Sequence, residues 1–433
     1  MFALNKNLLI ILITLLALAS LLLFGYLRAA PKREDAPHVQ LVSSPSQGAA
    51  DISPSLSAMA TNVSNIPDVV SKETTSGMTA AIVSLSDIKA CMTKPVQQIG
   101  ICYDALFREF FKTNTTADAL KIVAHYESTD SQLRYACHPV VHAIGRETFA
   151  KTRTVQDSFA ACDQTCHSGC YHGAMERFIR GDQNNDENAR HVNEEELEAK
   201  TVAACPSGQS GRFRFQCLHG LGHALLFSLD YQLEQTLAAC DKLAAAWDRS
   251  SCWGGAFMEN LFPSDPTKSD VSPSDYHYPC DKLNDQYKSD CYVMQTTRMT
   301  AMGLDAAQLF AECRKAGAYI LSCIQSIGRD LSNDARIKDP RLTAEKCELG
   351  QNKEERQSCT RGVIYALLDN TWDGRYAFPF CQAFVNQSDQ AYCTAASARY
   401  LVATYDKTKE MIFNDCIVRI HDQAACKNAL KEL

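Results

Sequence analysis

The spacing of the cysteines restricts what this 433-residue chain can fold into more than any other feature of its sequence. Sixteen of the 20 cysteines form eight pairs with nine to eleven residues between the members, namely 91/102, 205/217, 240/252, 280/291, 313/323, 347/359, 381/393 and 416/426. From Cys217 onward, the second members follow one another at intervals of 32 to 39 residues. This interval is typical of a two-helix repeat, so the sequence predicts a stacked array of helix pairs.

The residues around each pair indicate helices on both sides of it. Asp305 is a suitable N-cap, and the apolar residues that follow it up to Cys313 have helical spacing, so we expect the first cysteine of a pair to end one helix. After a short polar turn, the second cysteine, such as Cys291, is expected to open the next helix. Each disulfide would then join two antiparallel helices and stabilise them by roughly 3 kcal/mol in the chain-entropy model.

Four cysteines lie outside the regular pairs. Cys162 and Cys170 fit as a shortened pair, which leaves Cys137 and Cys166. Because the total is even and the neighbouring repeats are complete, we expect these two to bond to each other and to join the second and third repeats. The interval between Cys170 and Cys217 is 47 residues and holds a polar, acidic insertion at 181–198.

An array with this period and with a disulfide in each repeat resembles the disulfide-linked Sel1-like and tetratricopeptide-type solenoids. The resemblance covers about residues 85–433 and lies in period and disulfide position alone, so it transfers no functional residue. It implies an all-α, right-handed solenoid of about ten two-helix repeats, which we assign to residues 86–433.

The first 85 residues differ from the repeats. Residues 8–27 form an apolar run that is long enough to cross a bilayer as a helix, and we expect residues 1–28 to be an uncleaved membrane anchor. Residues 29–85 are rich in Ser, Pro, Ala and Thr without sustained periodicity, and we expect them to form a disordered stalk.

Two signals disagree about the side of the membrane on which the repeats lie. Basic residues are more frequent after the apolar run than before it, which alone would place the repeats in the cytoplasm. Regularly paired cysteines persist as disulfides only in oxidising compartments. We give more weight to the 20 cysteines and expect an extracytoplasmic location, whether periplasmic, extracellular or lumenal. The net charge of −7 argues against a nucleic-acid partner.

Three cysteine-bearing segments carry His or Glu side chains four residues apart. They read Cys137-His138-Pro-Val-Val-His142, Cys170-Tyr-His172-Gly-Ala-Met-Glu176 and Cys217-Leu-His219-Gly-Leu-Gly-His223. Side chains at i and i+4 lie on one face of a helix, and two such imidazoles can bind one metal ion. We therefore predict a divalent transition metal, which is zinc, copper or iron, with Glu176 as a further ligand or a general base. The predicted ligands are His138, His142, His172, His219 and His223.

Helical geometry suggests where these side chains point. If the second cysteine faces the first helix of its own repeat, residues two and six positions later lie at about 200° and 240°, on the opposite face. His138 and His142 fit this column less well than the other histidines. Elsewhere the column mixes Arg, Tyr and Gln, which is typical of a solvated groove. Its members Arg329, Arg361, Tyr365 and Arg399 are candidates for binding an anionic ligand.

Each of these motifs also has an alternative explanation. The histidines could be hydrogen-bonded groups that pack helices together, helped by nearby glycines. Cys162, Cys166, Cys170 and His167 could form a thiolate zinc site, although disulfides are favoured outside the cytoplasm.

Two classes of function follow from the sequence. One is a membrane-anchored, extracytoplasmic metalloenzyme, a hydrolase or an oxidoreductase, that acts on a ligand in the groove. The other is a non-catalytic repeat scaffold that binds a peptide or a protein.

Overall fold

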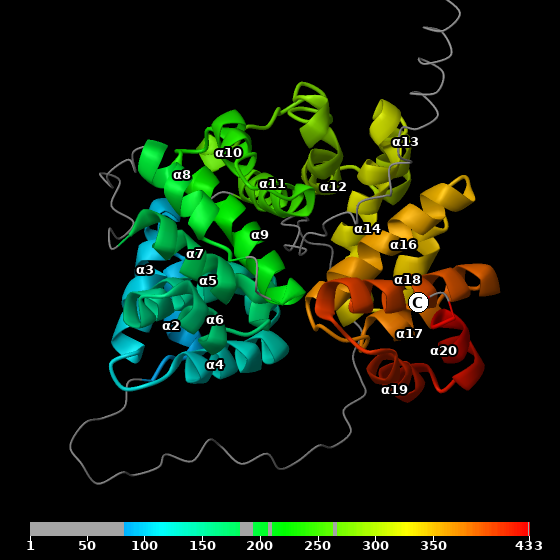
Figure 1. Ribbon diagram of the computed structural model, residues 1–433, viewed down its shortest axis with the longest axis horizontal. Helices are drawn as coiled ribbons and strands as arrows, with labels where there is room; N and C mark the ends of the chain where they lie inside the picture. Colours follow the sequence, from blue (N-terminus) through cyan, green and yellow to red (C-terminus); the bar gives the residue numbers. More distant parts are fainter. Residues whose placement is uncertain (1–81, 182–193, 207–209, 263–265, 432) are drawn as a thin grey trace, which may run out of the picture. The chain divides into compact units, whose positions relative to one another are not determined.

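The structure is a computed structural model that describes residues 82–181, 194–206, 210–262, 266–431 and 433. Within these ranges the chain is helical and contains no strand (Figure 1). Its α-helices are α2 (Leu85–Met92), α3 (Val96–Phe110), α4 (Thr116–Thr129), α5 (Ser131–Thr152), α6 (Val155–Ala161), α7 (Thr165–Arg180), α8 (Glu194–Ala203), α9 (Gly211–Ser228), α10 (Leu233–Cys240), α11 (Ala246–Leu261), α12 (Asp285–Ala301), α13 (Ala306–Cys313), α14 (Ile320–Ile337), α15 (Pro340–Cys347), α16 (Lys353–Asp369), α17 (Ala377–Gln382), α18 (Gln387–Tyr405), α19 (Lys409–Ile420) and α20 (Gln423–Ala429). Two short 3₁₀ helices are η1 (Pro266–Lys268) and η2 (Gly317–Tyr319).

All 20 cysteines are bonded, and the ten disulfides are the predicted ones. The eight regular pairs and the shortened Cys162–Cys170 pair each join residues of one repeat. Cys137 of α5 bonds to Cys166 of α7 with a Cα–Cα distance of 5.7 Å, inside the range expected of a disulfide. The prediction of a disulfide-linked helical array is therefore confirmed for the described residues.

Most repeats consist of a short helix followed by a longer one, and the capping signals explain where the short helices begin. Asp305 caps α13 with its side chain, and Gln308 completes a reciprocal capping box. As predicted, α10, α13 and α15 end on the first cysteine of their pair. Two repeats depart from the pattern. A segment containing only η1 precedes α12 in place of an α-helix, and in the last repeat α19 is longer than α20.

The second cysteines do not open the long helices, as the sequence suggested, but lie well inside them. Cys252, for example, follows almost two turns of α11. A disulfide needs Cα atoms about 4.4 to 6.8 Å apart. Antiparallel helices come this close where they lie side by side, and the first turns of the long helix are needed to bring it back alongside the short one.

The long helices pack directly against one another, and glycines permit the closest contacts. Helices α5, α7, α9 and α11 are successive neighbours, and so are α12, α14, α16 and α18 (Figure 1). A Cβ atom added at Gly173 of α7 would lie 1.9 Å from the carbonyl oxygen of His142 on α5. A Cβ added at Gly145 of α5 would lie 2.0 Å from the carbonyl oxygen of Cys170 on α7. No residue larger than glycine fits at either position.

The same reciprocal contact occurs in two further helix pairs. Gly222 of α9 lies against Cys252, and Gly255 of α11 lies against His219. The third pair, α14 and α16, is joined through Gly328 and Gly362 in the same way. We call these three units the α5/α7, α9/α11 and α14/α16 pairs.

This close packing overturns one expectation, namely that the column of residues two and six positions after the second cysteine faces an open groove. His172 and His219 are fully buried, and Arg329 is only 1% exposed. Arg329 instead bonds to Asp330 and Thr297 and to the carbonyl oxygen of Met294. These members of the column are buried because the next long helix lies directly on them. Arg361, Tyr365 and Arg399 are half-buried.

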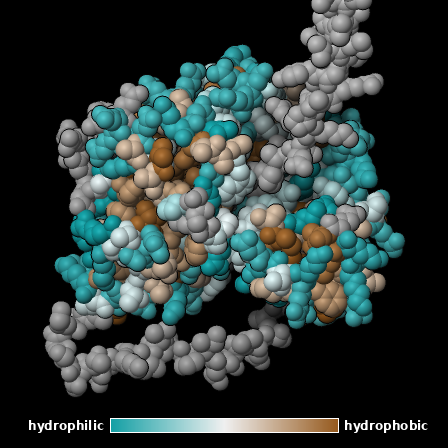
Figure 2. Space-filling model, viewed as in Figure 1, coloured by the Kyte–Doolittle hydropathy of each residue, from teal (hydrophilic) through white to brown (hydrophobic). Residues whose placement is uncertain are grey.

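The N-terminal boundary lies slightly earlier than expected. Val83 is buried and Ser84 caps α2, so the end of the range assigned to the stalk belongs to the helical domain. The predicted anchor at residues 1–28 and the rest of the stalk lie outside the described residues. No helix within the described ranges is both long and apolar enough to span a bilayer. Figure 2 shows a largely hydrophilic face with smaller apolar patches on it.

Candidate metal centre

Five histidines from three neighbouring helices converge in the interior. His138 and His142 come from α5, His172 from α7, and His219 and His223 from α9, and we call them the five-histidine cluster. The ring centroids of His172 lie 5.4 and 5.5 Å from those of His138 and His142, and 5.1 and 4.9 Å from those of His219 and His223. The i, i+4 spacing thus aligns two pairs along their helices, and helix packing brings the pairs to either side of His172.

The side chains of His138, His142 and His172 have the separation expected of metal ligands. One ring nitrogen of each lies within 4.8 Å of the corresponding nitrogens of the other two. His138 Nε2 and His142 Nε2 are 3.0 Å apart. Two nitrogens that share one ion at ~2.1 Å are themselves about 3.0 to 3.4 Å apart, so the pair is already at ligand spacing.

Hydrogen bonds to the opposite ring nitrogens determine which atoms face the centre. His138 Nδ1 donates to the carbonyl oxygen of Cys166 at 2.8 Å, and His142 Nδ1 donates to Glu176 Oε1 at 2.6 Å. A neutral imidazole protonated at Nδ1 carries its lone pair at Nε2. The two lone pairs therefore point at each other and repel, unless a cation or a proton lies between them. A backbone carbonyl or a carboxylate behind a histidine is also the usual outer partner of a metal ligand.

His172 contributes a nitrogen that has no other partner. Its Nε2 is 3.3 Å from Gln216 Oε1, and its Nδ1 is buried without a hydrogen bond. If Nε2 donates to the amide oxygen, Nδ1 carries a lone pair and is the atom available to a metal. A buried polar atom without a partner costs about 1 to 3 kcal/mol, which a bound ion would remove.

The protein interior favours the neutral form of three of the histidines, as metal binding requires. Burial holds the pKa of His138 well below its usual value, and the neighbouring His142 lowers it further. Burial and the nearby His223 likewise hold the pKa of His172 and of His219 well below the usual value. A protonated imidazole has no lone pair for a metal, so this environment favours the binding form at neutral pH.

Glu176 is held in place as an ionised carboxylate. Burial by itself would raise its pKa, but the adjacent His142 and Arg146 and their hydrogen bonds outweigh burial and hold the pKa well below the usual value. Its second oxygen accepts from Arg146 at 2.7 Å, and Arg146 also donates to Asp104 at 2.8 Å. Both carboxylate oxygens are therefore occupied on the outer side of His142. This geometry suits a residue that orients His142 rather than a general base.

A left-handed turn at the start of α7 supports the centre. Cys166, His167 and Ser168 all have positive φ angles, between 50° and 62°, which cost roughly 1 to 2 kcal/mol each for residues with a side chain. The turn directs the carbonyl of Cys166 towards His138. Gly169 follows, and a Cβ there would lie within 3.0 Å of both His138 and His142. Strained backbone of this kind is concentrated at functional sites in proteins.

The thiolate zinc site is excluded by the disulfides. Cys162 bonds to Cys170 and Cys166 bonds to Cys137, so these sulfurs are not available as ligands. His167 Nδ1 instead meets the side-chain oxygen of Asn370, which follows α16. Burial and the nearby Arg336 lower the pKa of His167 to about 3.

The predicted anion-binding residues do not gather at the five-histidine cluster. Tyr365 of α16 stacks on Tyr400 of α18, with ring centroids 4.1 Å apart. The positive charges of Arg361 and Arg399 act on Tyr365, so these three side chains form a group of their own. Arg329 lies close enough to His219 for its charge to lower the pKa of that histidine, but it is buried.

Sequence reasoning missed several residues around the histidines. Glu259 of α11 accepts from His223 Nδ1 at 2.9 Å, and Tyr231 donates to Glu259 at 2.8 Å. Gln216 contacts His172, and Arg146 holds Glu176. Glu259 lies seven residues after Cys252, close to the position that Glu176 holds relative to the second cysteine of its own repeat. This spacing is the one signal that could have found Glu259.

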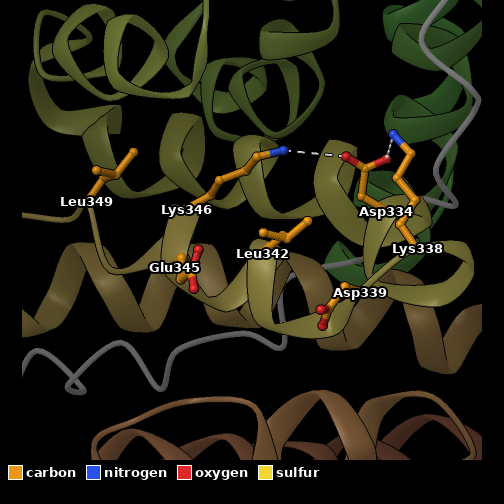
Figure 3. Close-up of a pocket in the computed structure, with 7 residues that line it drawn as sticks. All are labelled: Asp334, Lys338, Asp339, Leu342, Glu345, Lys346 and Leu349. Atoms are coloured by element: carbon orange, nitrogen blue, oxygen red, sulfur yellow. Dashed lines mark hydrogen bonds and ion pairs between the residues drawn. The ribbon is translucent and has the colours of Figure 1, made fainter. Parts of the chain in front are cut away.

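A separate surface pocket of about 380 Å³ lies on α14 and α15 (Figure 3). Exposed Leu342 and Leu349 lie among charged side chains, and Asp334 forms ion pairs with Lys338 and Lys346. None of its lining residues belongs to the five-histidine cluster.

Comparisons of the chain with protein-family models, with curated proteins and with solved structures found no match. The candidate centre is therefore interpreted from its own geometry.

Proposed function

We propose that this chain is an extracytoplasmic metalloprotein in which His138, His142 and His172 hold a divalent transition metal. The observation that carries the proposal is the pair of Nε2 atoms of His138 and His142, which face each other at 3.0 Å while both Nδ1 atoms donate to oxygens. The nitrogen of His172 completes a three-nitrogen set. Imidazole ligands suit zinc, copper and iron, and every cysteine sulfur is already in a disulfide.

The disulfides support the extracytoplasmic location in this proposal. Ten intramolecular disulfides persist in an oxidising environment such as the periplasm, the extracellular space or the lumen of the secretory pathway. Attachment to a membrane through the apolar run at residues 8–27 remains part of the proposal and rests on the sequence alone.

The donor set favours a reactive centre over a purely structural one. Structural zinc sites usually have four protein ligands, whereas catalytic ones have three and keep one position for water or substrate. His138, His142 and Glu176 are 7 to 9% exposed, while His172 is fully buried. Access is therefore from the α5 side, and because these residues are so little exposed, a small molecule fits this approach better than a polymer does.

We accordingly propose a metal-dependent hydrolase or oxidoreductase that acts on a small substrate. His138, His142 and His172 hold the ion, Glu176 orients His142, and Arg146 holds Glu176. The ion supplies an acidic centre for activating water or a redox centre. The role first expected of Glu176, a general base, is replaced here by an orienting one because both its oxygens are occupied.

The test is the metal content of the full-length chain, purified in detergent and measured by elemental analysis after dialysis against metal-free buffer. We expect at least one equivalent of zinc, copper or iron per chain, and we expect His142→Gln to lose most of it. The matched control is His277→Gln, because His277 also lies beside a carboxylate, Glu312, at 3.2 Å, yet belongs to no cluster. Absence of metal from the wild-type chain, also after addition of each ion, would mean that a proton bridges the two Nε2 atoms and that the cluster is a packing feature.

The second candidate function is a scaffold that binds a peptide or protein. The observation that favours it is the α14/α15 pocket, where Leu342 and Leu349 are exposed beside charged residues (Figure 3). Leu342→Asp would then abolish binding of the partner and leave metal content unchanged.

A further inference from the structure

The second histidine pair repeats the arrangement of the first. His219 Nε2 and His223 Nε2 are 3.3 Å apart, again at the spacing of two ligands of one ion. His223 Nδ1 donates to Glu259 on the next long helix, as His142 Nδ1 donates to Glu176. Each carboxylate is in turn held by a donor, which is Tyr231 for Glu259 and Arg146 for Glu176.

The first histidines of the two pairs differ in their outer partners. His138 Nδ1 donates to the carbonyl of Cys166, which lies on the neighbouring long helix. His219 Nδ1 makes no well-formed hydrogen bond. In both pairs the two Nε2 atoms nevertheless face each other, at 3.0 and 3.3 Å.

The glycine contacts show that these histidines are not needed for helix packing. When the α5/α7, α9/α11 and α14/α16 pairs are aligned on Gly145, Gly222 and Gly328, His142 corresponds to His219 and to Gln325. Arg146 corresponds in the same alignment to His223 and Arg329. The α14/α16 pair makes the same contacts without any imidazole, so close packing alone does not explain the histidines.

The alignment also shows that the second pair is displaced by one helical turn relative to the first. Positions 138 and 142 on α5 correspond to Phe215 and His219 on α9, so His223 adds a ligand one turn further along. The two pairs therefore do not compete for one point. His172 lies between them, with ring centroids 4.9 to 5.5 Å from all four rings.

We infer that the five-histidine cluster holds two divalent metal ions, one at His138, His142 and His172 and the second at His219 and His223. This inference rests on the proposed function, since it adds an ion to the same cluster. Each ion has one carboxylate behind its histidine pair, Glu176 or Glu259, and these offset part of the charge brought into the interior. Each bound ion is a transition metal ion of borderline softness, because the donor atoms are imidazole nitrogens.

The test is the zinc stoichiometry of the full-length chain in detergent. The protein is stripped with a chelator and titrated with Zn²⁺, and bound zinc is measured by equilibrium dialysis and elemental analysis. We expect two equivalents for the wild type, one for His219→Gln/His223→Gln, one for His138→Gln/His142→Gln, and two for the control His277→Gln. Circular dichroism and disulfide mapping of each variant report whether the fold is kept.

The outcomes separate this inference from the proposed function. No zinc in the wild type overturns both. One equivalent in the wild type overturns the second ion and leaves the proposed function in place when changing His138 and His142 removes it. If a variant fails to fold, the wild-type stoichiometry still decides between one ion and two.

Discussion

Replacing Gly173 with alanine tests whether the close packing of α5 against α7 positions the metal ligands. The added Cβ would lie 1.9 Å from the carbonyl oxygen of His142, whereas an ordinary carbon–oxygen contact is about 3.3 Å. Helices α5 and α7 must then move apart by roughly 1.4 Å at this point. The bond between His142 and Glu176, now 2.6 Å, would exceed the ~3.5 Å limit of a hydrogen bond. His172 would move away from His138 and His142 by a similar amount.

The expected cost has two parts that can be measured separately. Overpacking a core position costs about 1 to 3 kcal/mol of unfolding free energy. Loss of the partner that orients a metal-bound histidine lowers metal affinity by about 10- to 100-fold. We expect Gly173→Ala to show both effects, the first in urea unfolding of the chelator-stripped chain and the second in equilibrium dialysis with Zn²⁺.

Gly362→Ala is the matched control. Its Cβ would lie 1.9 Å from the carbonyl oxygen of Gln325, the same contact in a helix pair that has no histidine. The control should lose comparable stability and keep its metal affinity. If Gly173→Ala loses stability like the control but binds zinc as tightly as the wild type, the register of α5 against α7 does not position the ligands and the reasoning is refuted.

Two further predictions concern the pH dependence of stability and the role of one disulfide in zinc binding. Burial raises the pKa of Asp369 to about 7 despite hydrogen bonds from Tyr405 and Tyr400. The folded chain therefore binds a proton at Asp369 more tightly than the unfolded chain does. As a result, the stability of the folded chain falls as pH rises from about 4 to about 7. Asp369→Asn should therefore stabilise the chain at pH 8 by up to about 4 kcal/mol and have little effect at pH 4, as measured by urea unfolding, and a benefit independent of pH would contradict this. Replacing Cys137 and Cys166 with alanine removes the link that holds the turn beneath His138, so zinc affinity should fall, whereas removal of the Cys347–Cys359 disulfide should lower stability alone. Equal zinc affinity in the two cysteine variants would argue against a role for the turn.

The sequence by itself determined the repeat and its disulfides. Cysteines separated by 10 to 12 residues within a repeat bond locally, because a helix, a short turn and the start of the next helix return the chain to within disulfide range. Cys137 and Cys166 followed by elimination. The helical period likewise placed His138 beside His142 and His219 beside His223, since side chains four residues apart share one helix face.

Only the tertiary structure decided what surrounds those histidines. The angle of a side chain around its own helix says which way it points but not how near the next helix lies, and that distance is set by glycines such as Gly173 and Gly255 on the neighbouring helix. Several members of the column predicted to line a groove, such as His172, His219 and Arg329, are therefore buried. Glu259 could not be assigned to His223 for the same reason, because their contact depends on the register of α11 against α9, which residues on both helices determine together.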